Sequence, residues 1–174
     1  NYMIESRKEK GIAQPNDMVV KTIVTTNMID VIAERNGVNC YNVLTGFKWI
    51  AELIKEKEGK ENYVIGGEES YGLMIGSRIR DKDAVSAVAI LCEMAAYEKS
   101  KGRSLYAKLL DLYLQYGYYQ EELISITKKG MNGQQEIAPA RAVHPARAKD
   151  QGRRAAVANR GLAGQLARAV GVQR

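Results

Sequence analysis

The chain has 174 residues, of which 45% are hydrophobic and 26% are charged, and its formal net charge is +6. This length fits one domain that buries a sizeable core. The longest apolar stretch, residues 84–96, is interrupted by Ser86 and Glu93 and falls short of the ~20 apolar residues that span a bilayer. We therefore expect neither a membrane-spanning segment nor a signal peptide.

The positive charge is confined to the end of the chain. Residues 1–137 hold 18 basic and 19 acidic side chains, whereas residues 138–174 hold 8 basic side chains and one acidic side chain. This second region also contains eleven alanines and no aromatic residue. Its composition predicts a separate, disordered or weakly helical tail of foreign or frame-shifted character, and we favour this over a nucleic-acid-binding arm.

The first half of the chain alternates short apolar runs with helical patterns. The start at Asn1 has the pattern of a helix interior, as though a longer protein had been cut. Thr25 and Thr26 are candidate caps for the first full helix, and Gly37 is expected to end it. The expected elements are strands at 19–24, 38–43 and 63–65, and helices at 27–35 and 47–57.

The second half is expected to be mainly helical up to residue 117. Asp83 is a candidate cap for a helix that ends at Gly102, and a second helix runs from Ser104 to near Gly117. The apolar residues of the first helix recur at helical spacing: Val85, Val88, Leu91, Cys92, Ala95 and Ala96. A final strand is expected at residues 118–127. Strands that alternate with helices predict an α/β fold with a mostly parallel, mixed sheet flanked by helices.

Cysteine and histidine residues show no metal-binding or redox spacing. Cys40 and Cys92 are expected to be buried, reduced thiols of a cytoplasmic protein. The only histidine, His144, has no neighbouring cysteine or histidine. We therefore expect no metal ligands in this chain.

The motif Gly-Gly-Glu-Glu-Ser at residues 66–70 follows an expected strand. Its glycines allow the backbone to turn and to approach a ligand closely. A carboxylate accepts hydrogen bonds from two neighbouring hydroxyl groups, which is the pattern that the diol of a sugar offers. The alternative is a solvated acidic turn that only connects two elements.

Cations follow this motif at Arg80 and Lys82. Such side chains neutralise phosphate groups, so the segment suggests a site for an anion. Lys82 is a candidate proton carrier if it is partly desolvated beside Arg80. The alternative is a surface cluster of ion pairs with Asp83 as a helix cap.

Three segments together resemble the third domain of the α-D-phosphohexomutases, the phosphoglucomutase/phosphomannomutase family. They are Leu-Thr-Gly-Phe-Lys-Trp at 44–49, Gly-Glu-Glu-Ser-Tyr-Gly at 67–72 and Arg-Asp-Lys-Asp-Ala-Val at 80–85. Val-Lys-Thr-Ile-Val-Thr-Thr at 20–26 is similar to the phosphoglucomutase branch that is related to phosphopentomutases. The resemblance covers about residues 1–137.

The resemblance implies one domain of a four-domain, cytoplasmic isomerase of carbohydrate metabolism. Such an enzyme is an intramolecular phosphotransferase that interconverts the 1-phosphate and 6-phosphate of a phosphorylated hexose or pentose, through an intermediate such as glucose 1,6-bisphosphate. The sugar is held in two opposed orientations, so recognition falls on hydroxyl groups that occupy similar places in both. Other domains supply a phosphoserine and the ligands of Mg²⁺.

The resemblance implies catalytic or substrate-binding roles for eight residues. Lys82 is implied as the catalytic residue, an acid/base or electrostatic group beside the transferred phosphate. Glu69 is expected to be an outer acid, and Phe47, Trp49 and Tyr71 are expected to pack in the core or the wall. The residues implied to bind substrate are Glu68, Ser70, Thr45, Gly46, Gly67, Lys48 and Arg80.

The chain also departs from the family pattern. It has no phosphoserine loop, no aspartate-rich magnesium loop and no fourth-domain phosphate loop, and these parts carry most of phosphoryl transfer. We therefore expect this chain alone to be inactive and its partners to be the missing mutase domains. The alternatives are a non-catalytic sugar-phosphate-binding or interaction module and nucleic-acid binding through the tail.

Overall fold

The structure is a computed structural model that describes residues 1–121. The chain divides into two units, residues 1–109 and 110–174, and each is described by itself. Three sequence predictions lie outside the described residues: the strand from residue 122 onward, the tail at 138–174 and the surroundings of His144.

The first unit is built on a four-stranded sheet with the strand order β2-β1-β3-β4. Its first three strands are parallel, and β4 pairs with β3 in the antiparallel direction. The predicted mostly parallel, mixed sheet is therefore confirmed. The strands are β1 (Asp17–Thr22), β2 (Asn39–Val43), β3 (Asn62–Glu68) and β4 (Gly72–Ile75).

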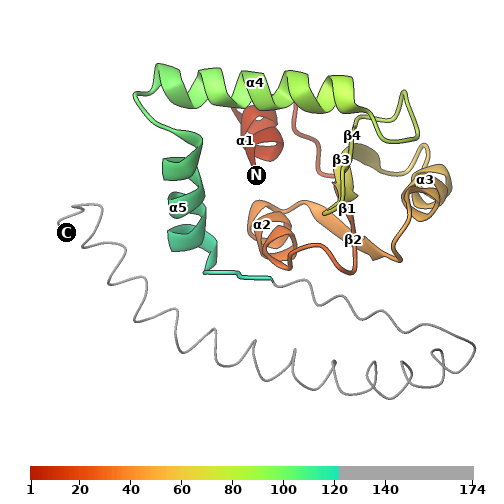
Figure 1. Cartoon of the computed structure of the whole chain (residues 1–174). Coiled ribbons are helices and arrows are strands. Elements are labelled where there is room, and N and C mark those ends of the chain that lie inside the picture. The colour runs from red at the N-terminus through yellow and green to blue at the C-terminus, as the bar shows by residue number, and fades with distance from the viewer. Residues whose placement is uncertain (122–174) are drawn as a thin grey trace, which may run out of the picture. The chain divides into compact units, whose positions relative to one another are not determined.

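Helices cover both faces of this sheet. Figure 1 shows α3 on one face and α1 and α2 on the opposite face. Helix α4 contacts β4. The helices of the first unit are α1 (Tyr2–Glu9), α2 (Met28–Asn36), α3 (Phe47–Glu56) and α4 (Ala84–Ser100).

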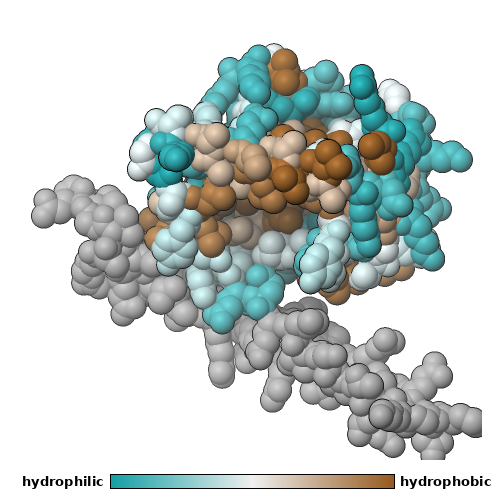
Figure 2. Space-filling model, turned by 45° about the horizontal axis from the view of Figure 1, so that its top comes forward, coloured by the Kyte–Doolittle hydropathy of each residue, from teal (hydrophilic) through white to brown (hydrophobic). Residues whose placement is uncertain are grey.

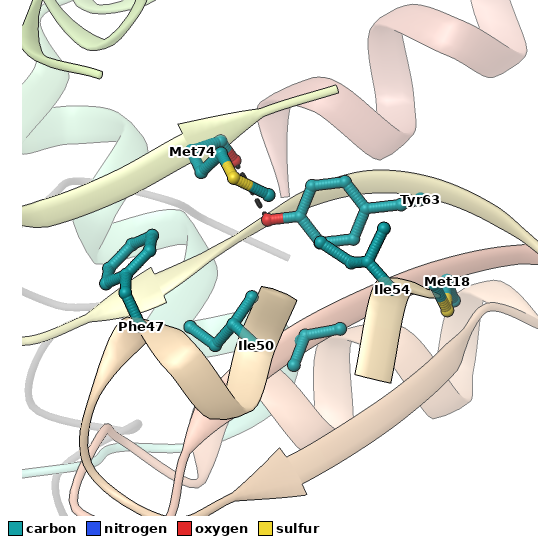
Figure 3. Packing of buried hydrophobic residues seen from close by; sticks show 7 residues of the cluster. Met18, Phe47, Ile50, Ile54, Tyr63 and Met74 are labelled. Carbon is teal, nitrogen blue, oxygen red and sulfur yellow. Dashed lines mark hydrogen bonds between the residues drawn. The ribbon is translucent and has the colours of Figure 1, made fainter. Parts of the chain in front are cut away.

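The central strand β1 is buried along its whole length. Because successive side chains of a strand point to opposite faces, Met18 and Val20 lie together on the α3 side. There they join a cluster that also contains Phe47, Ile50, Ile54, Tyr63 and Met74. Figure 3 shows this packing, in which the Tyr63 hydroxyl donates to the Met74 carbonyl oxygen at 3.1 Å.

Two predicted helix ends are confirmed. Helix α2 stops at Gly37, whose left-handed backbone (φ 68°) costs glycine little. The Asp83 carboxylate caps α4 by accepting from the backbone N–H groups of Val85 and Ser86 at 3.1 and 3.3 Å. At the start of α2 the cap position is Asn27, and Thr26 only accepts from the backbone N–H of Met28.

The strand β4 was missing from the sequence prediction, which ended the third strand at residue 65. Instead β3 continues to Glu68 and forms a hairpin with β4. Its glycines are required by close approach: a Cβ on Gly66 would lie 2.2 Å from the Val20 carbonyl oxygen, and one on Gly67 would lie 2.2 Å from that of Gly72. The motif is therefore strand and hairpin turn rather than a flexible loop.

Helix α4 forms as predicted, but several of its apolar residues lie on the surface, including Val85, Val88 and Leu91. Cys92 is exposed and Cys40 is half-buried, and both are free thiols, so the prediction of two buried thiols is wrong. In the part of the chain that the structure describes, none of the helices is both long and apolar enough to cross a membrane.

Helix α5 (Leu105–Tyr116) confirms the predicted helix after Ser104, and it crosses the boundary between the two units. Within the second unit the rings of Tyr113 and Tyr118 pack edge to face at 5.0 Å. Residues 118–121 form no strand. The first four residues of the predicted final strand are therefore irregular.

Candidate functional site

Three sequence motifs meet at the carboxyl edge of the sheet. Thr22 pairs with Val43 at the ends of β1 and β2, and Lys21 pairs with Gly67 of β3. Because parallel strands end at one edge, the segments that follow β1 and β2 lie beside the end of β3. These segments include Gly46 after β2 and Thr25 after β1.

Glu68 contacts residues from two other segments at this edge of the sheet. Its carboxylate accepts a hydrogen bond from the backbone N–H of Gly46 at 2.5 Å. The ammonium group of Lys82 lies 3.6 Å from the other carboxylate oxygen. The side chain of Glu68 is only 7% exposed, so a nearly buried acid joins the motifs at 44–49, 67–72 and 80–85.

Lys82 lies at the rim of the Glu68 site. Its side chain is 48% exposed, and its ammonium group lies 5.5 Å from the centre of the Phe47 ring. Arg80 turns away and pairs with Glu58 at 2.6 Å. Lys82 is therefore a half-exposed cation whose near charge is Glu68, while Arg80 pairs with Glu58.

A second cluster forms around Glu69, on the opposite side of the chain from Glu68. Its carboxylate accepts from the hydroxyl groups of Thr22 and Thr25 at 3.4 Å each and of Ser70 at 3.1 Å. The pKa of Glu69 is lowered, first by its own backbone N–H and then by these hydroxyl groups. Glu69 therefore ties the hairpin turn to the end of β1.

Ser70 lies apart from Glu68 in this structure. Its hydroxyl is exposed and donates to Glu69, and among the described residues no hydrogen bond joins it to Glu68. The next residue, Tyr71, is fully exposed and has a left-handed backbone (φ 52°). The expected packing of Tyr71 is therefore wrong, whereas Phe47 is buried in the core as expected.

The remaining predicted residues line the loop that precedes α3. Thr45 is exposed, and Gly46 takes φ 121°, a backbone angle that favours glycine. The ammonium group of Lys48 lies 4.8 Å from the centre of the Trp49 ring. Lys48 and Thr45 therefore face solvent next to the Gly46–Glu68 contact.

Sequence reasoning assigned no role to Lys21, which is 2% exposed at the end of β1. Its ammonium group donates to the Thr25 carbonyl oxygen at 3.2 Å and pairs with Asp30 at 3.1 Å. Asp30 also accepts from Asn42 at 2.7 Å. The sequence feature that could have revealed this site is a lysine inside a run of β-branched residues. Such a run predicts a buried strand, and a buried cation needs hydrogen-bonding or charged partners.

A shallow groove of about 300 Å³ lies beside this edge, along α3. It contains neither Glu68 nor Lys82, and its two glutamates would repel a phosphate group. We therefore place the candidate site at Glu68 rather than in the groove. The groove is lined by Asn42, Val43, Leu44, Trp49, Glu52, Leu53 and Glu56.

Residues 1–121 contain no cluster of three or more His, Cys, Asp or Glu side chains that could hold a metal ion. The acids of the site are spread over two sides of the hairpin, with Glu68 turned to Gly46 and Glu69 turned to threonine hydroxyls. These described residues therefore do not fit a magnesium site.

The family model for phosphoglucomutase/phosphomannomutase, alpha/beta/alpha domain III, matches residues 2–113. The chain belongs to this family. The phosphoglucomutase of Staphylococcus epidermidis is 35% identical to it over 137 residues, and that of Staphylococcus aureus is 33% identical over the same length. Both alignments cover 79% of this chain.

A crystal structure of a protein described as a putative phosphomannomutase from Thermus thermophilus shares the fold, with a TM-score of 0.54 and 26% sequence identity. That match covers 74% of this chain and 28% of the other chain. The chain also spans only 24% of the length of the staphylococcal enzymes. It thus corresponds to one domain of these longer family members.

Proposed function

We propose that this chain is the sugar-binding domain of a phosphoglucomutase/phosphomannomutase-type enzyme that interconverts sugar 1-phosphates and 6-phosphates. The observation that carries this proposal is the Glu68 carboxylate, which is held by the Gly46 N–H and faced by Lys82. It joins three family motifs at the edge where ligands bind in α/β sheets. Residues 1–137 form the proposed domain, and 138–174 form a separate tail.

The proposed binding of the sugar depends on how many hydrogen bonds the Glu68 carboxylate can still accept. An ionised carboxylate offers about four lone-pair positions, of which the Gly46 N–H occupies one. Two neighbouring sugar hydroxyl groups would donate to the remaining positions. Lys82, half exposed, would swing from Glu68 to the phosphate and so uncover the acid.

The outer residues complete the proposed site. Ser70 would exchange its bond to Glu69 for one to the sugar, and Thr45, Gly46 and Gly67 would form the wall next to the hydroxyl groups. Lys48 would border the sugar. Arg80 would act from the rim, because its present partner is the exposed Glu58.

The rest of the longer enzyme would supply what residues 1–121 lack. We propose that Mg²⁺ and the phosphoserine belong to other domains, that glucose 1,6-bisphosphate is the intermediate, and that this chain alone is inactive. The free thiols Cys40 and Cys92 fit a cytoplasmic enzyme, because thiols stay reduced there.

The test is a chimera in which residues 2–113 replace the matching domain of the Staphylococcus epidermidis phosphoglucomutase. We expect it to interconvert glucose 1-phosphate and glucose 6-phosphate, and Glu68→Ala to lower kcat/KM by about 100-fold or more. Glu69→Ala is the matched control, with a loss of no more than about tenfold. Near-normal activity of the Glu68 variant would contradict the assignment.

A binding measurement separates the enzyme domain from a non-catalytic sugar-phosphate module. In the 174-residue chain the Gly46 amide reports directly on Glu68, because the two are hydrogen bonded. We expect glucose 6-phosphate to shift the NMR signal of this amide only at millimolar concentration, since one domain supplies few of the contacts. Micromolar binding together with an inactive chimera would favour the module instead.

A further inference from the structure

Helix α4 is apolar on the side that faces away from its own unit. Val85 is 81% exposed, Val88 is 59% exposed and Leu91 is 49% exposed. Figure 2, which brings the α4 side forward, shows a band of apolar side chains across this surface. We define the α4 apolar face by its exposed residues Ala84, Val85, Val88, Ala89, Leu91, Cys92 and Ala96.

The face is continuous along the helix. Val85, Val88 and Cys92 are three and then four residues apart, so they lie on one side of a helix with 3.6 residues per turn. No charged residue occurs from position 84 to position 92. The first charged residue on the exposed side is Glu93, which accepts from the Tyr2 hydroxyl at 2.8 Å.

A surface helix normally carries charged and polar side chains on its solvent side, and a helix that is apolar all round is normally covered all round. In α4 the side toward the sheet contacts β4, whereas the other side has no cover among the described residues. An uncharged surface attracts neither nucleic acid nor an acidic partner. Its complement is another apolar surface.

We propose that the α4 apolar face is the contact surface for another domain of the longer mutase polypeptide. The same domain makes up only 24% of the staphylococcal relatives, so the remaining three quarters of such a protein lie outside this chain. This inference rests on membership of the family and on the proposed place of the domain in a longer enzyme. It does not depend on the sugar chemistry of Glu68.

The size of the face favours a domain of the same polypeptide over a second copy of the chain. A stable free dimer buries about 800 Å² on each partner, with roughly 20–30 residues a side. The seven residues of the face fall well short of that. A contact within one polypeptide needs less surface, because the linker holds the two parts at an effective concentration in the millimolar range.

Cys92 provides the test, because it lies within the face and is itself exposed. The reaction of Cys92 with iodoacetamide is measured in the 174-residue chain by mass spectrometry of its peptides. The same rate is measured for a single cysteine at the aligned position of the full-length Staphylococcus epidermidis phosphoglucomutase, whose other cysteines are replaced by serine. Each protein unfolded in urea gives its own reference rate.

We expect Cys92 of the chain to react within about tenfold of its unfolded rate, and the cysteine of the full-length enzyme at least about 100-fold more slowly than its own. Similar ratios in the two proteins would overturn the proposal. Protection of Cys92 in the chain that increases with protein concentration would also overturn it, because a second copy would then be the occupant. Neither rate reports catalysis, so loss of the proposed activity leaves this test intact.

A charge introduced into the face gives a second, independent readout. In the 174-residue chain, Leu91→Glu is expected to leave the midpoint of thermal unfolding nearly unchanged. At the aligned position of the full-length enzyme, it is expected to lower that midpoint by several degrees, because a buried charge is costly. Ser100→Glu, at the end of the same helix, is the control, and equal shifts for Leu91→Glu in both proteins would contradict the proposal.

Discussion

Asp17 and Glu68 are two nearly buried carboxylates at opposite ends of the parallel strands. Asp17 begins β1, is 4% exposed, and accepts two hydrogen bonds from Arg7, one from Asn62 and one from the backbone N–H of Gln14. Glu68 ends β3 and is 7% exposed, yet within residues 1–121 it accepts a single hydrogen bond, from Gly46.

The difference lies in unfilled hydrogen-bonding capacity. A carboxylate accepts about four hydrogen bonds, so Asp17 is saturated by its own chain and has nothing to offer a ligand. Glu68 is similarly buried but keeps most of its hydrogen-bond acceptor positions unoccupied. In the proposed function, it is this free capacity, and not burial alone, that would let Glu68 bind a ligand.

The largest expected effect is that of Asp17→Asn on stability. An amide cannot accept all four hydrogen bonds and leaves Arg7 without its countercharge. We expect the free energy of unfolding of the 174-residue chain to fall by about 3 kcal/mol, measured by urea denaturation. A decrease in the free energy of unfolding below about 1 kcal/mol would show that the hydrogen bonds of Asp17 do not stabilise the fold as expected.

A smaller loss is expected from Gly67→Ala, which tests the hairpin that carries Glu68. The new Cβ would meet the Gly72 carbonyl oxygen, and backbone cannot move aside as a side chain can. We expect a loss of about 2 kcal/mol in the same assay. Gly59→Ala is the control: its Cβ meets nothing within 4 Å, so only the strain of φ 76° remains, about 1 kcal/mol. Equal losses of stability in the two variants would show that the close approach of Gly67 to the Gly72 carbonyl oxygen has no energetic effect.

Glu68→Gln makes the same chemical change as Asp17→Asn at the other end of the sheet. Because Glu68 has one hydrogen bond to lose and its cation is half exposed, we expect a change in the free energy of unfolding below about 1 kcal/mol. The two variants are compared in one series of urea denaturations. If the glutamine variant loses as much stability as the asparagine variant, the distinction between the two acids fails.

The smallest effect is on the pH dependence of stability. Burial alone would raise the pKa of Asp17, but the hydrogen bonds from Arg7, Asn62 and Gln14 hold it below its ordinary value of 3.8. A depressed pKa stabilises the fold above the ordinary value, and this contribution is lost as the pH falls through the lowered pKa. Thermal unfolding below pH 4 should therefore be less pH-dependent in Asp17→Asn than in the original chain, and identical slopes would contradict this.

The sequence predicted the elements that depend on local signals. The end of α2 at Asn36-Gly37 and the Asp83 cap of α4 depend only on neighbouring residues in the chain, and the structure contains both. The strand β4 is different, because Gly72–Ile75 carries no strand pattern of its own and is held by its ladder with β3. Tertiary pairing of this kind leaves no periodic trace in a single sequence.

The candidate site shows the same division. Glu68, Gly46 and Lys82 belong to motifs that the sequence marks, and the structure brings them together. The partners of Arg80 and Ser70 could not be predicted. Arg80 pairs with Glu58 and Ser70 donates to Glu69, and these contacts depend on a three-dimensional arrangement that the sequence does not show. The exposure of Cys92 and Val85 was equally invisible, since helical spacing shows that residues share a side but not what covers it.

The pairing of Glu68 with Gly72 fixes the acid in the backbone ladder and leaves residues 69–71 as the tip of the hairpin. Substitutions in that tip would therefore leave the backbone position of Glu68 set by its pairing with Gly72. Under the proposed function, a library of substitutions at residues 69–71 would alter the selectivity among sugars without altering the strands beneath.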